Sequence, residues 1–298
     1  MEQPLVTVVV VSYNHSKFVK ENLDSIKNQT YKNIQLIVGD DASPDQSADV
    51  IEQWLQENKF SAEKNFHIQN TGLAAMLNEC VALAKGKYIK LIAADDFLHP
   101  QALEKSVSKL ESLGNKYGML FTNTHTIDND SNIIEDIANY DTLGNIDPHI
   151  FRKELIKGNR IAALTVLLRT DVLKETGKYD SKFIVEDFYR WLMISEKYLI
   201  GYIPEKLAYY RMHQENISKI REEKIEMETI LLQMMFDKEG IVKERVNRFT
   251  QKYYFSGIKL PPEYKSAYHD YPFRVKRLDL ALQNRIPVPF YKLLNKIV

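Results

Sequence analysis

The sequence predicts an α/β protein with a mainly parallel sheet. Two observations lead to this fold class. Short apolar runs rich in β-branched residues alternate with segments of helical spacing from Leu5 to Thr124, and polar clusters follow three of the apolar runs. A strand that is buried on both faces has such a continuous apolar run, and strands that alternate with helices form right-handed βαβ units. We therefore expect a Rossmann-like sheet with helices on its faces.

Each element is predicted from its own local pattern. The predicted strands are, in chain order, residues 5–11, 34–38, 66–69, 88–94, 119–124, 162–169 and 206–209. The predicted helices, in which apolar residues recur every three or four positions, are residues 17–28, 47–57, 73–84, 100–113 and 185–196. Gly86 stands where a helix C-cap is expected. The polar stretch 127–158 predicts a loop over a site, and the chain from Arg221 onward predicts mostly helix.

Composition excludes several classes of protein. The 298 residues contain 40 basic and 40 acidic side chains, and this zero net charge argues against nucleic acid as a partner. The one cysteine, Cys80, can form neither an internal disulfide nor a cysteine-based zinc site. No apolar run is long enough to span a bilayer, and the N-terminus lacks a basic stretch. We therefore expect a cytoplasmic protein.

Three strand ends carry polar clusters that predict a binding site. The clusters are Ser12-Tyr13-Asn14, Asp40-Asp41 and Asp95-Asp96. Ligands of open parallel sheets bind beyond the carboxyl ends of the strands, so all three clusters are expected along one edge. A turn or an N-cap explains one aspartate of each pair, but less easily the second.

The usual phosphate-binding glycine loops are missing from the sequence. Neither the dinucleotide-binding fingerprint nor the P-loop pattern occurs, which disfavours a Rossmann dehydrogenase and a P-loop enzyme. Carboxylates repel a diphosphate unless a divalent cation lies between them. Asp95 and Asp96 offer the hard oxygen ligands that suit Mg²⁺ or Mn²⁺ shared with phosphate oxygens.

Two downstream clusters add candidate catalytic groups. Glu186-Asp187 opens the predicted helix 185–196, where a simple cap is the competing interpretation. Arg211 and His213 follow the predicted strand 206–209. Beside a diphosphate and a metal, a guanidinium and an imidazole can stabilise a leaving group.

With these residues in place, the chain resembles the inverting family 2 glycosyltransferases of GT-A fold over roughly residues 4 to 219. The matching segments occur in the family's order. They are Val6 to Asn14, Ser25 to Tyr31, Asp40 to Asp45, Asn70 to Gly72 with Asn78, Gly86 to Ile89 with Asp95, Asp96 and Pro100, Gly177 to Asp180 with Glu186 and Asp187, and Tyr210 to His213 with Asn216 and Ser218. The family often has an Asp at the position of Ala93 and an Arg at that of Leu77.

The resemblance implies a role for each matching position. Tyr13 would stack on the nucleotide base and Asp41 would hydrogen-bond a uracil edge. Asp187 would be the general base, and Glu186 would support it or touch the acceptor. The remaining implied donor contacts are Ser12, Asn14, Asn78, Asp95 and Arg211, and the implied ligands of Mn²⁺ or Mg²⁺ are Asp95, Asp96 and His213.

The predicted activity is transfer of a sugar, most simply from a UDP-sugar, to an acceptor hydroxyl of a glycan, a lipid-linked or a protein-linked acceptor, as in polysaccharide biosynthesis. Two alternatives stay open. A nucleotidyltransferase would also use an aspartate-bound metal, but it would need a basic, glycine-rich loop after the first strand. A sugar-nucleotide-binding module without turnover would rest on Ala93 and Leu77.

The two predicted domains are a catalytic domain, 1–219, and a mostly helical region, 220–298. Between Pro272 and Val298 there are six basic residues and one acidic residue, interspersed with aromatic and aliphatic ones. Such a segment predicts either packing within the protein or in a homo-oligomer, or contact with an anionic membrane surface. The second interpretation would place the protein at the inner face of the membrane.

Overall fold

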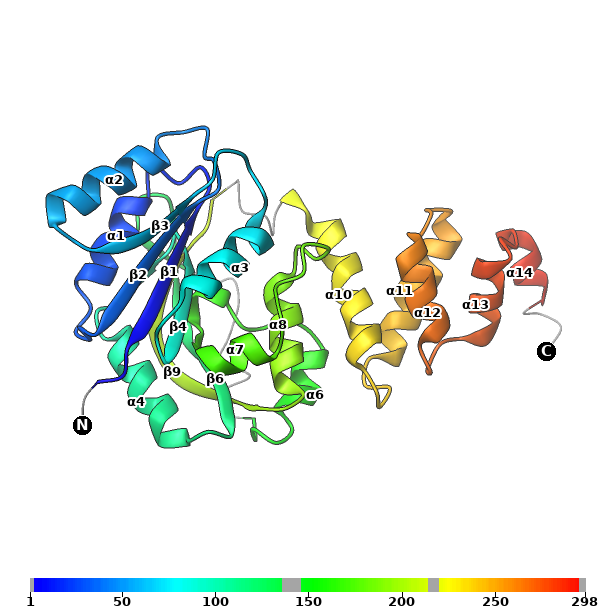
Figure 1. Cartoon of the computed structure of the whole chain (residues 1–298). Coiled ribbons are helices and arrows are strands. Elements are labelled where there is room, and N and C mark those ends of the chain that lie inside the picture. The colour runs from blue at the N-terminus through cyan, green and yellow to red at the C-terminus, as the bar shows by residue number, and fades with distance from the viewer. Residues whose placement is uncertain (1–2, 136–145, 214–219, 295–298) are drawn as a thin grey trace. The chain divides into compact units, whose positions relative to one another are not determined.

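The computed structural model describes residues 3–135, 146–213 and 220–294 (Figure 1). Its strands are β1 (Val6–Ser12), β2 (Ile34–Asp40), β3 (Ala62–Phe66), β4 (Tyr88–Ala93), β5 (Phe97–Leu98), β6 (Tyr117–Ile127), β7 (Ile133–Ile134), β8 (Leu167–Arg169) and β9 (Leu199–Arg211). Its helices are α1 (Val19–Lys27), α2 (Ser47–Asn58), α3 (Leu73–Leu83), α4 (Ala102–Leu113), α6 (Phe151–Ile156), α7 (Thr170–Glu175), α8 (Glu186–Ser195), α10 (Glu222–Phe236), α11 (Lys243–Ser256), α12 (Pro262–Asp270), α13 (Lys276–Gln283) and α14 (Val288–Leu294). Within the described ranges, every helix is too short or too polar to cross a bilayer.

The strands form one mixed sheet in the order β3-β2-β1-β4-β8-β6-β9-β5, with β7 paired to β6. The first four strands of this order are parallel, as are β6 and β9. The short strands β8 and β5 join antiparallel. The predicted α/β class is therefore confirmed, and the parallel half of the sheet is the half that the alternating pattern covers.

Helices cover both faces of the parallel strands (Figure 1). The helices α1, α2 and α4 pack on one face, and α3 packs on the opposite face against β1, β2 and β3. The valines of β1 are buried on both sides, which explains the continuous apolar run at the start of the chain. Gly39 allows α3 to approach, because a Cβ there would lie 2.4 Å from the Met76 Sδ.

The pairing of β5 with β9 brings together two distant parts of the sequence. Phe97 lies opposite Tyr209 and Leu98 lies opposite Ala208 in this antiparallel pair. The residues that precede β5 therefore lie beside the residues that follow Tyr209 in β9. This register places Asp95 and Asp96 beside Arg211 and the residues that follow it.

Several predicted elements differ from the observed ones. The strand predicted at 66–69 is β3, which lies earlier in the chain, and Ile68 is fully exposed. The strand predicted at 162–169 is a 3₁₀ turn, Ala163–Thr165, followed by β8. Gly86 is not the C-cap of α3, because the helix ends at Leu83 and its C-cap is Ala84. A Cβ on Gly86 would lie 2.5 Å from the Thr7 backbone nitrogen, and this close approach explains the glycine.

The chain divides into two compact units. The first comprises residues 1–152 and 160–220, and it contains the sheet. The second comprises residues 153–159 and 221–298. Its described helices α10 to α13 enclose a core rich in tyrosine, in which the Tyr271 hydroxyl donates to the Asp237 carboxylate at 2.7 Å.

Candidate active site

Three polar strand ends lie next to one another at the carboxyl edge of the parallel strands. Ser12 pairs with Asp40 across β1 and β2, and Val11 pairs with Ala93 across β1 and β4. Past the strands, the Asp41 amide donates to the Ser12 carbonyl at 3.0 Å. The prediction that the three clusters share one edge is confirmed by these registers.

Asp95 lies at the centre of a buried polar cluster on this edge. Its Oδ2 is 3.0 Å from the His213 Nε2 and 3.8 Å from the His15 Nε2. Its Oδ1 is buried and has no hydrogen-bond partner among the residues that the structure describes. The buried Asp96 accepts a hydrogen bond from the Arg211 backbone amide at 2.9 Å. The structure therefore brings Asp95, Asp96 and His213 together, as the sequence predicted.

The two aspartates differ in their electrostatic environment. Burial by itself would raise the pKa of Asp95, but the His213 hydrogen bond and the nearby His15 lower it. Burial and the charge of Asp95 raise the pKa of Asp96, against the opposing effect of Arg211. Asp95 is therefore the carboxylate of the pair that stays ionised.

The donor set fits a divalent cation that is shared with a ligand. An ionised, buried carboxylate oxygen without a partner is costly unless a cation or a ligand meets it. Among the described residues, no group of three or more histidine, cysteine or acidic side chains is placed to hold a metal by itself. A cation here would need further oxygen ligands, and substrate phosphates are the usual source for Mg²⁺. Asp95 with His213 could hold such an ion.

Arg211 is held by contacts within the protein. Its side chain is fully buried, and its guanidinium donates to the carbonyls of Asp95 and Asp128 at 2.8 and 2.7 Å. It also pairs with Glu21 and lies 4.5 Å over the Phe18 ring. The guanidinium thus ties the loop carrying Asp95 to β9, and the contact of Arg211 with the donor stays a prediction.

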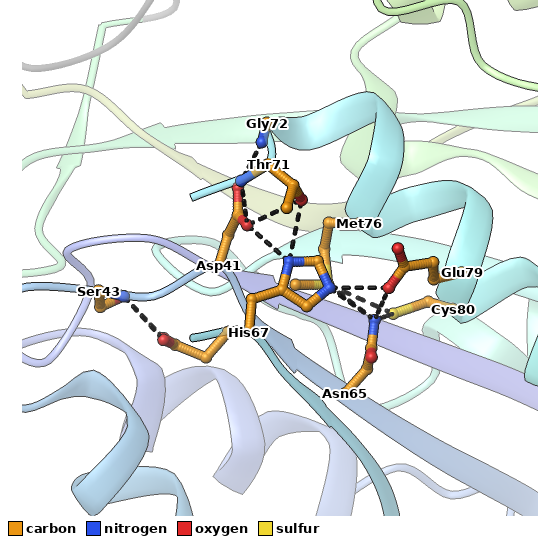
Figure 2. Close-up of polar contacts among 10 residues, drawn as sticks. Asp41, Ser43, Asn65, His67, Thr71, Gly72, Met76, Glu79 and Cys80 are labelled. Carbon is orange, nitrogen blue, oxygen red and sulfur yellow. Dashed lines mark hydrogen bonds and ion pairs between the residues drawn. The ribbon is translucent and has the colours of Figure 1, made fainter. Parts of the chain in front are cut away.

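Asp41 occupies a separate cradle on the same edge (Figure 2). Its Oδ1 accepts from the Thr71 amide at 2.8 Å, and its Oδ2 accepts from the Gly72 amide at 2.8 Å. Burial opposes the charge of Asp41, but these bonds and one from His67 lower its pKa. The result is a fixed, ionised carboxylate whose Oδ2 still has a lone pair to offer.

The first polar cluster lies next to Asp41 in the fold, because the Asp41 backbone amide donates to the Ser12 carbonyl. Tyr13 has 44% of its surface exposed, which leaves its ring available for stacking. Asn14 adopts a φ of 62°, and its amide donates to the Ser43 hydroxyl at 3.1 Å. The Ser12 hydroxyl is buried, and it makes no hydrogen bond within the described part of the chain. The exposed ring of Tyr13 is therefore open to a planar ligand.

The segment that begins at Tyr179 connects Asn78 with Glu186 and Asp187. The Asn78 side-chain amide donates to the Tyr179 carbonyl at 2.9 Å and accepts from its backbone nitrogen at 2.8 Å. Asn78 thus holds the segment that leads into α8. Glu186 and Asp187 form the half-buried first turn of that helix, and the Asp187 Oδ1 accepts from the Phe188 amide at 2.6 Å. The helix α8 packs on β9.

Sequence reasoning missed three residues of this site. Asn22 is fully buried, and its amide donates to the carbonyls of Ala93 and Asp96 at 3.0 and 2.8 Å. His15 faces Asp95, and His67 faces Asp41. His15 directly follows the Ser12-Tyr13-Asn14 cluster and could have been included with it. Asn216 and Ser218, which belong to the resemblance, lie outside the described residues.

Comparison with known sequences identifies close counterparts of this chain. The family model of glycosyl transferase family 2 matches residues 7–162. An uncharacterised glycosyltransferase of Methanocaldococcus jannaschii is 32% identical over 237 residues, which is 76% of this chain and 77% of that protein. A putative glycosyltransferase of Bacillus subtilis, EpsH, is 36% identical over 106 residues, covering 35% of this chain and 30% of that protein.

Comparison with solved structures shows the same fold. A mannosyltransferase of Pyrobaculum calidifontis, solved with GDP-Man and Mn²⁺, has a TM-score of 0.65 at 16% identity and covers 90% of this chain and 75% of its own. Residues 1–349 of TarS from S. aureus, solved with UDP, have a TM-score of 0.62 at 17% identity, with 94% of this chain and 86% of that chain covered. The family match, the archaeal relative and these two folds agree: the chain belongs to glycosyl transferase family 2 and is a glycosyltransferase with the GT-A fold.

Proposed function

We propose that the protein transfers a sugar from a nucleotide-sugar, a UDP-sugar in the first instance, to an acceptor hydroxyl of a glycan or glycoconjugate, with inversion at the anomeric carbon. One observation carries this proposal: the buried Asp95 Oδ1, which no described residue hydrogen-bonds, lies at the carboxyl edge of the sheet, with His213 and His15 beside its carboxylate. A diphosphate with its cation would satisfy this oxygen. Solved relatives in fold hold GDP-Man with Mn²⁺ or UDP, which supports a nucleotide-sugar and a divalent metal here.

The base of the donor is assigned to the cradle of Asp41. An ionised carboxylate can only accept hydrogen bonds, so it suits a base that presents a ring N–H. Uracil and guanine have such a group, whereas cytosine and adenine present a lone pair at the equivalent ring nitrogen. Tyr13, with its exposed ring, would stack on the base. The resemblance to the family favours uracil of the two.

The reaction is a single displacement at the anomeric carbon. Asp187 takes the proton of the acceptor hydroxyl, and a well-placed base of this kind contributes about 10²–10⁴-fold in rate. The bond from the acceptor oxygen to the anomeric carbon forms while the bond to the diphosphate breaks, and the nucleoside diphosphate leaves. A Mn²⁺ or Mg²⁺ ion, when bound, supplies positive charge to the departing diphosphate. His213 holds the Asp95 carboxylate by its hydrogen bond.

A screen of UDP-sugars tests this proposal. We expect hydrolysis of one UDP-sugar, or its transfer to an acceptor, in the presence of Mn²⁺ or Mg²⁺, and loss of activity with EDTA. Binding of UDP without turnover of any UDP-sugar would favour a binding module. Release of pyrophosphate from a nucleoside triphosphate and a sugar phosphate would favour a nucleotidyltransferase.

We further propose that residues 1–219 form the catalytic domain and that residues 220–298 serve packing, oligomer formation or contact with the inner face of a cytoplasmic membrane. The exposed side chains of Leu280 and Phe290, next to Arg277, Arg285 and Lys292, motivate the membrane alternative. Co-sedimentation of the full chain with anionic vesicles tests it. Equal recovery in the pellet with and without vesicles would remove membrane contact from the proposal.

A further inference from the structure

A continuous line of hydrogen bonds runs from Asp41 to the exposed side of α3 (Figure 2). The Asp41 Oδ1 lies 2.8 Å from the His67 Nδ1, and the His67 Nε2 lies 2.7 Å from the Glu79 Oε2. The Asn65 amide donates to the same Glu79 oxygen at 2.9 Å. His67 directly follows β3, and its own backbone amide donates to the Asp40 carbonyl at 2.9 Å. One imidazole thus connects the base cradle with a helix.

The two carboxylates that face His67 favour the form of the imidazole in which both ring nitrogens are donors. Two carboxylates face it, Asp41 from the loop after β2 and Glu79 from α3, while its recorded polar neighbours Thr71 and Asn65 are uncharged. A neutral imidazole has one N–H, so it can serve one carboxylate but not both. Burial would lower the pKa of His67, but its bonds to Glu79 and Asp41 outweigh burial and raise it. The side chains of His67 and Asp41 are 11% and 7% exposed, so solvent screens their contact little, whereas that of Glu79 is 52% exposed and its contact is screened more.

His67 supplies a positive charge, which the backbone cradle of Asp41 lacks. Thr71 and Gly72 fix the carboxylate through two amides and a hydroxyl, and these neutral donors are present at any pH. Among the described residues, the His67 contact is the one that joins Asp41 to a positive charge. It orients the Asp41 carboxylate and, together with the bonds from Thr71 and Gly72, lowers its pKa and so favours the ionised state that can accept from a base.

We infer that His67, held between Asp41 and Glu79, is a positioning residue that makes the binding of the nucleotide base depend on pH. The inference rests on the proposed function, in which Asp41 contacts the base. The charged form of His67 is stabilised in the folded protein, so its hydrogen bonds to Asp41 and Glu79 are both present below the ordinary pKa of a histidine. This charge is lost as the pH rises through the raised pKa of His67, and the one remaining N–H can then serve only one of the two carboxylates. UDP affinity should therefore weaken on the alkaline side, and the loss should appear in the KM for the donor and not in kcat.

The experiment is calorimetric titration of UDP, with Mn²⁺ present, into the full-length protein from pH 6 to pH 9. The His67→Gln variant should bind UDP about tenfold more weakly at pH 6, the loss expected for one charge-assisted hydrogen bond, and its affinity should no longer change through the pH range in which wild type weakens. The Glu79→Gln variant keeps a hydrogen-bond acceptor for His67 but removes the charge. Its affinity should equal that of wild type at pH 6, and its decline should begin at lower pH.

Two matched controls separate this effect from general ones. Glu52→Gln removes a surface glutamate that pairs with Lys64 on β3, and His269→Gln removes a histidine of the second unit whose side chain is 57% exposed. Both should leave the UDP affinity and its pH profile unchanged. Chemical shifts of the His67 ring, followed by NMR without ligand, should titrate at lower pH in Glu79→Gln than in Glu52→Gln.

The outcomes are distinct. Wild type that binds UDP, together with His67→Gln and Glu79→Gln variants of unchanged affinity and pH profile, overturns the role of His67 and leaves the proposed function standing. Wild type that binds no UDP at any pH rejects the proposed function and this inference with it. If His67→Gln does not fold, the Glu79→Gln variant decides the role of His67, because Glu79 is exposed and its replacement should still shift the pH profile of UDP binding.

Discussion

The Asp187 carboxylate is the residue on which the proposed chemistry depends. We expect Asp187→Asn to abolish sugar transfer, by about 10²-fold or more, because an amide cannot take the acceptor's proton. UDP binding should persist, since the donor contacts are assigned to other residues. Transfer rates and UDP affinity, measured on the same preparation, check this.

Asp171 offers a matched control for this variant. Its Oδ1 accepts from the next backbone amide, that of Val172, at 2.8 Å in the first turn of α7, as the Asp187 Oδ1 does in α8. Asp171→Asn should keep both transfer and binding. A folded Asp187→Asn protein that loses UDP binding and transfer together would assign Asp187 to the structure of the donor site instead.

Lys90 carries a prediction about stability. It is fully buried in β4 without a recorded ion pair among the described residues, and burial lowers its pKa to about 7 from 10.5. The unfolded chain then binds the proton more tightly, so stability should rise as the pH increases from 7 towards 10.5. Lys90→Met should stabilise the protein at pH 7 by about 1–4 kcal/mol, with a smaller gain at pH 10.

Urea unfolding of Lys90→Met at both pH values checks this, with Lys64→Met on the exposed edge strand β3 as the control. Lys64 pairs with Glu52 at the surface, so its replacement should change the free energy of unfolding by less than about 1 kcal/mol. If Lys90→Met were less stable than wild type at pH 7, this would contradict the claim that the Lys90 amine is buried without a compensating charge.

Among the site residues, the sequence could predict those at strand ends but not their partners. Asp41, Asp95 and Asp96 follow apolar runs, so their edge of the sheet was predictable. His67 and Asn22 were not, because their roles depend on contacts with residues far away in sequence, such as Asp41 and Ala93. The sequence position of Arg211 likewise does not reveal that its guanidinium is buried and bonded.

At the scale of elements, Gly86 shows how strand packing supports the site. A Cβ there would lie 2.5 Å from the Thr7 nitrogen and 2.7 Å from the Tyr88 carbonyl, both of them backbone atoms. Gly86→Ala should therefore force β4 away from β1 and destabilise the protein by about 3 kcal/mol. Because β4 ends at the Asp95 loop, UDP affinity should fall as well.

Gly158→Ala is the control for this substitution, measured by the same urea unfolding. Its added Cβ would meet nothing closer than the Arg245 side chain at 3.9 Å, so stability should change by no more than about 1 kcal/mol. Equal stability of Gly86→Ala and wild type would show that β1 and β4 are not held at the observed spacing.

The elements that the sequence misplaced have a common physical cause. The edge strand β3 is polar and half-exposed, and its register is set by pairing with β2, so apolar pattern alone put it too late in the chain. The strand β9 is far longer than predicted. Its pairing with β6 is irregular around Pro204, which interrupts the alternation that sequence reasoning relies on.

On the scale of the whole molecule, the two compact units should respond differently to ligand. The candidate site lies entirely in the first unit, and a ligand stabilises the structure that binds it by about 2.7 kcal/mol at a hundred times its Kd. Hydrogen exchange with UDP and Mn²⁺ should slow in residues 12–15, 40–45, 67–72 and 93–97. The helices α11 to α13 should exchange as before. If exchange slowed only in α11 to α13, the nucleotide would bind in the second unit, which would contradict this prediction.

The central claim is that the carboxyl edge of the sheet holds an activated sugar through a cation at Asp95. The most direct measurement is a crystal structure with UDP and Mn²⁺, with anomalous data collected at the manganese edge. We predict a manganese peak in contact with the Asp95 carboxylate and the diphosphate, with the base between Tyr13 and Asp41. A nucleotide bound elsewhere, or an Asp95 carboxylate without a metal beside an ordered diphosphate, would contradict it.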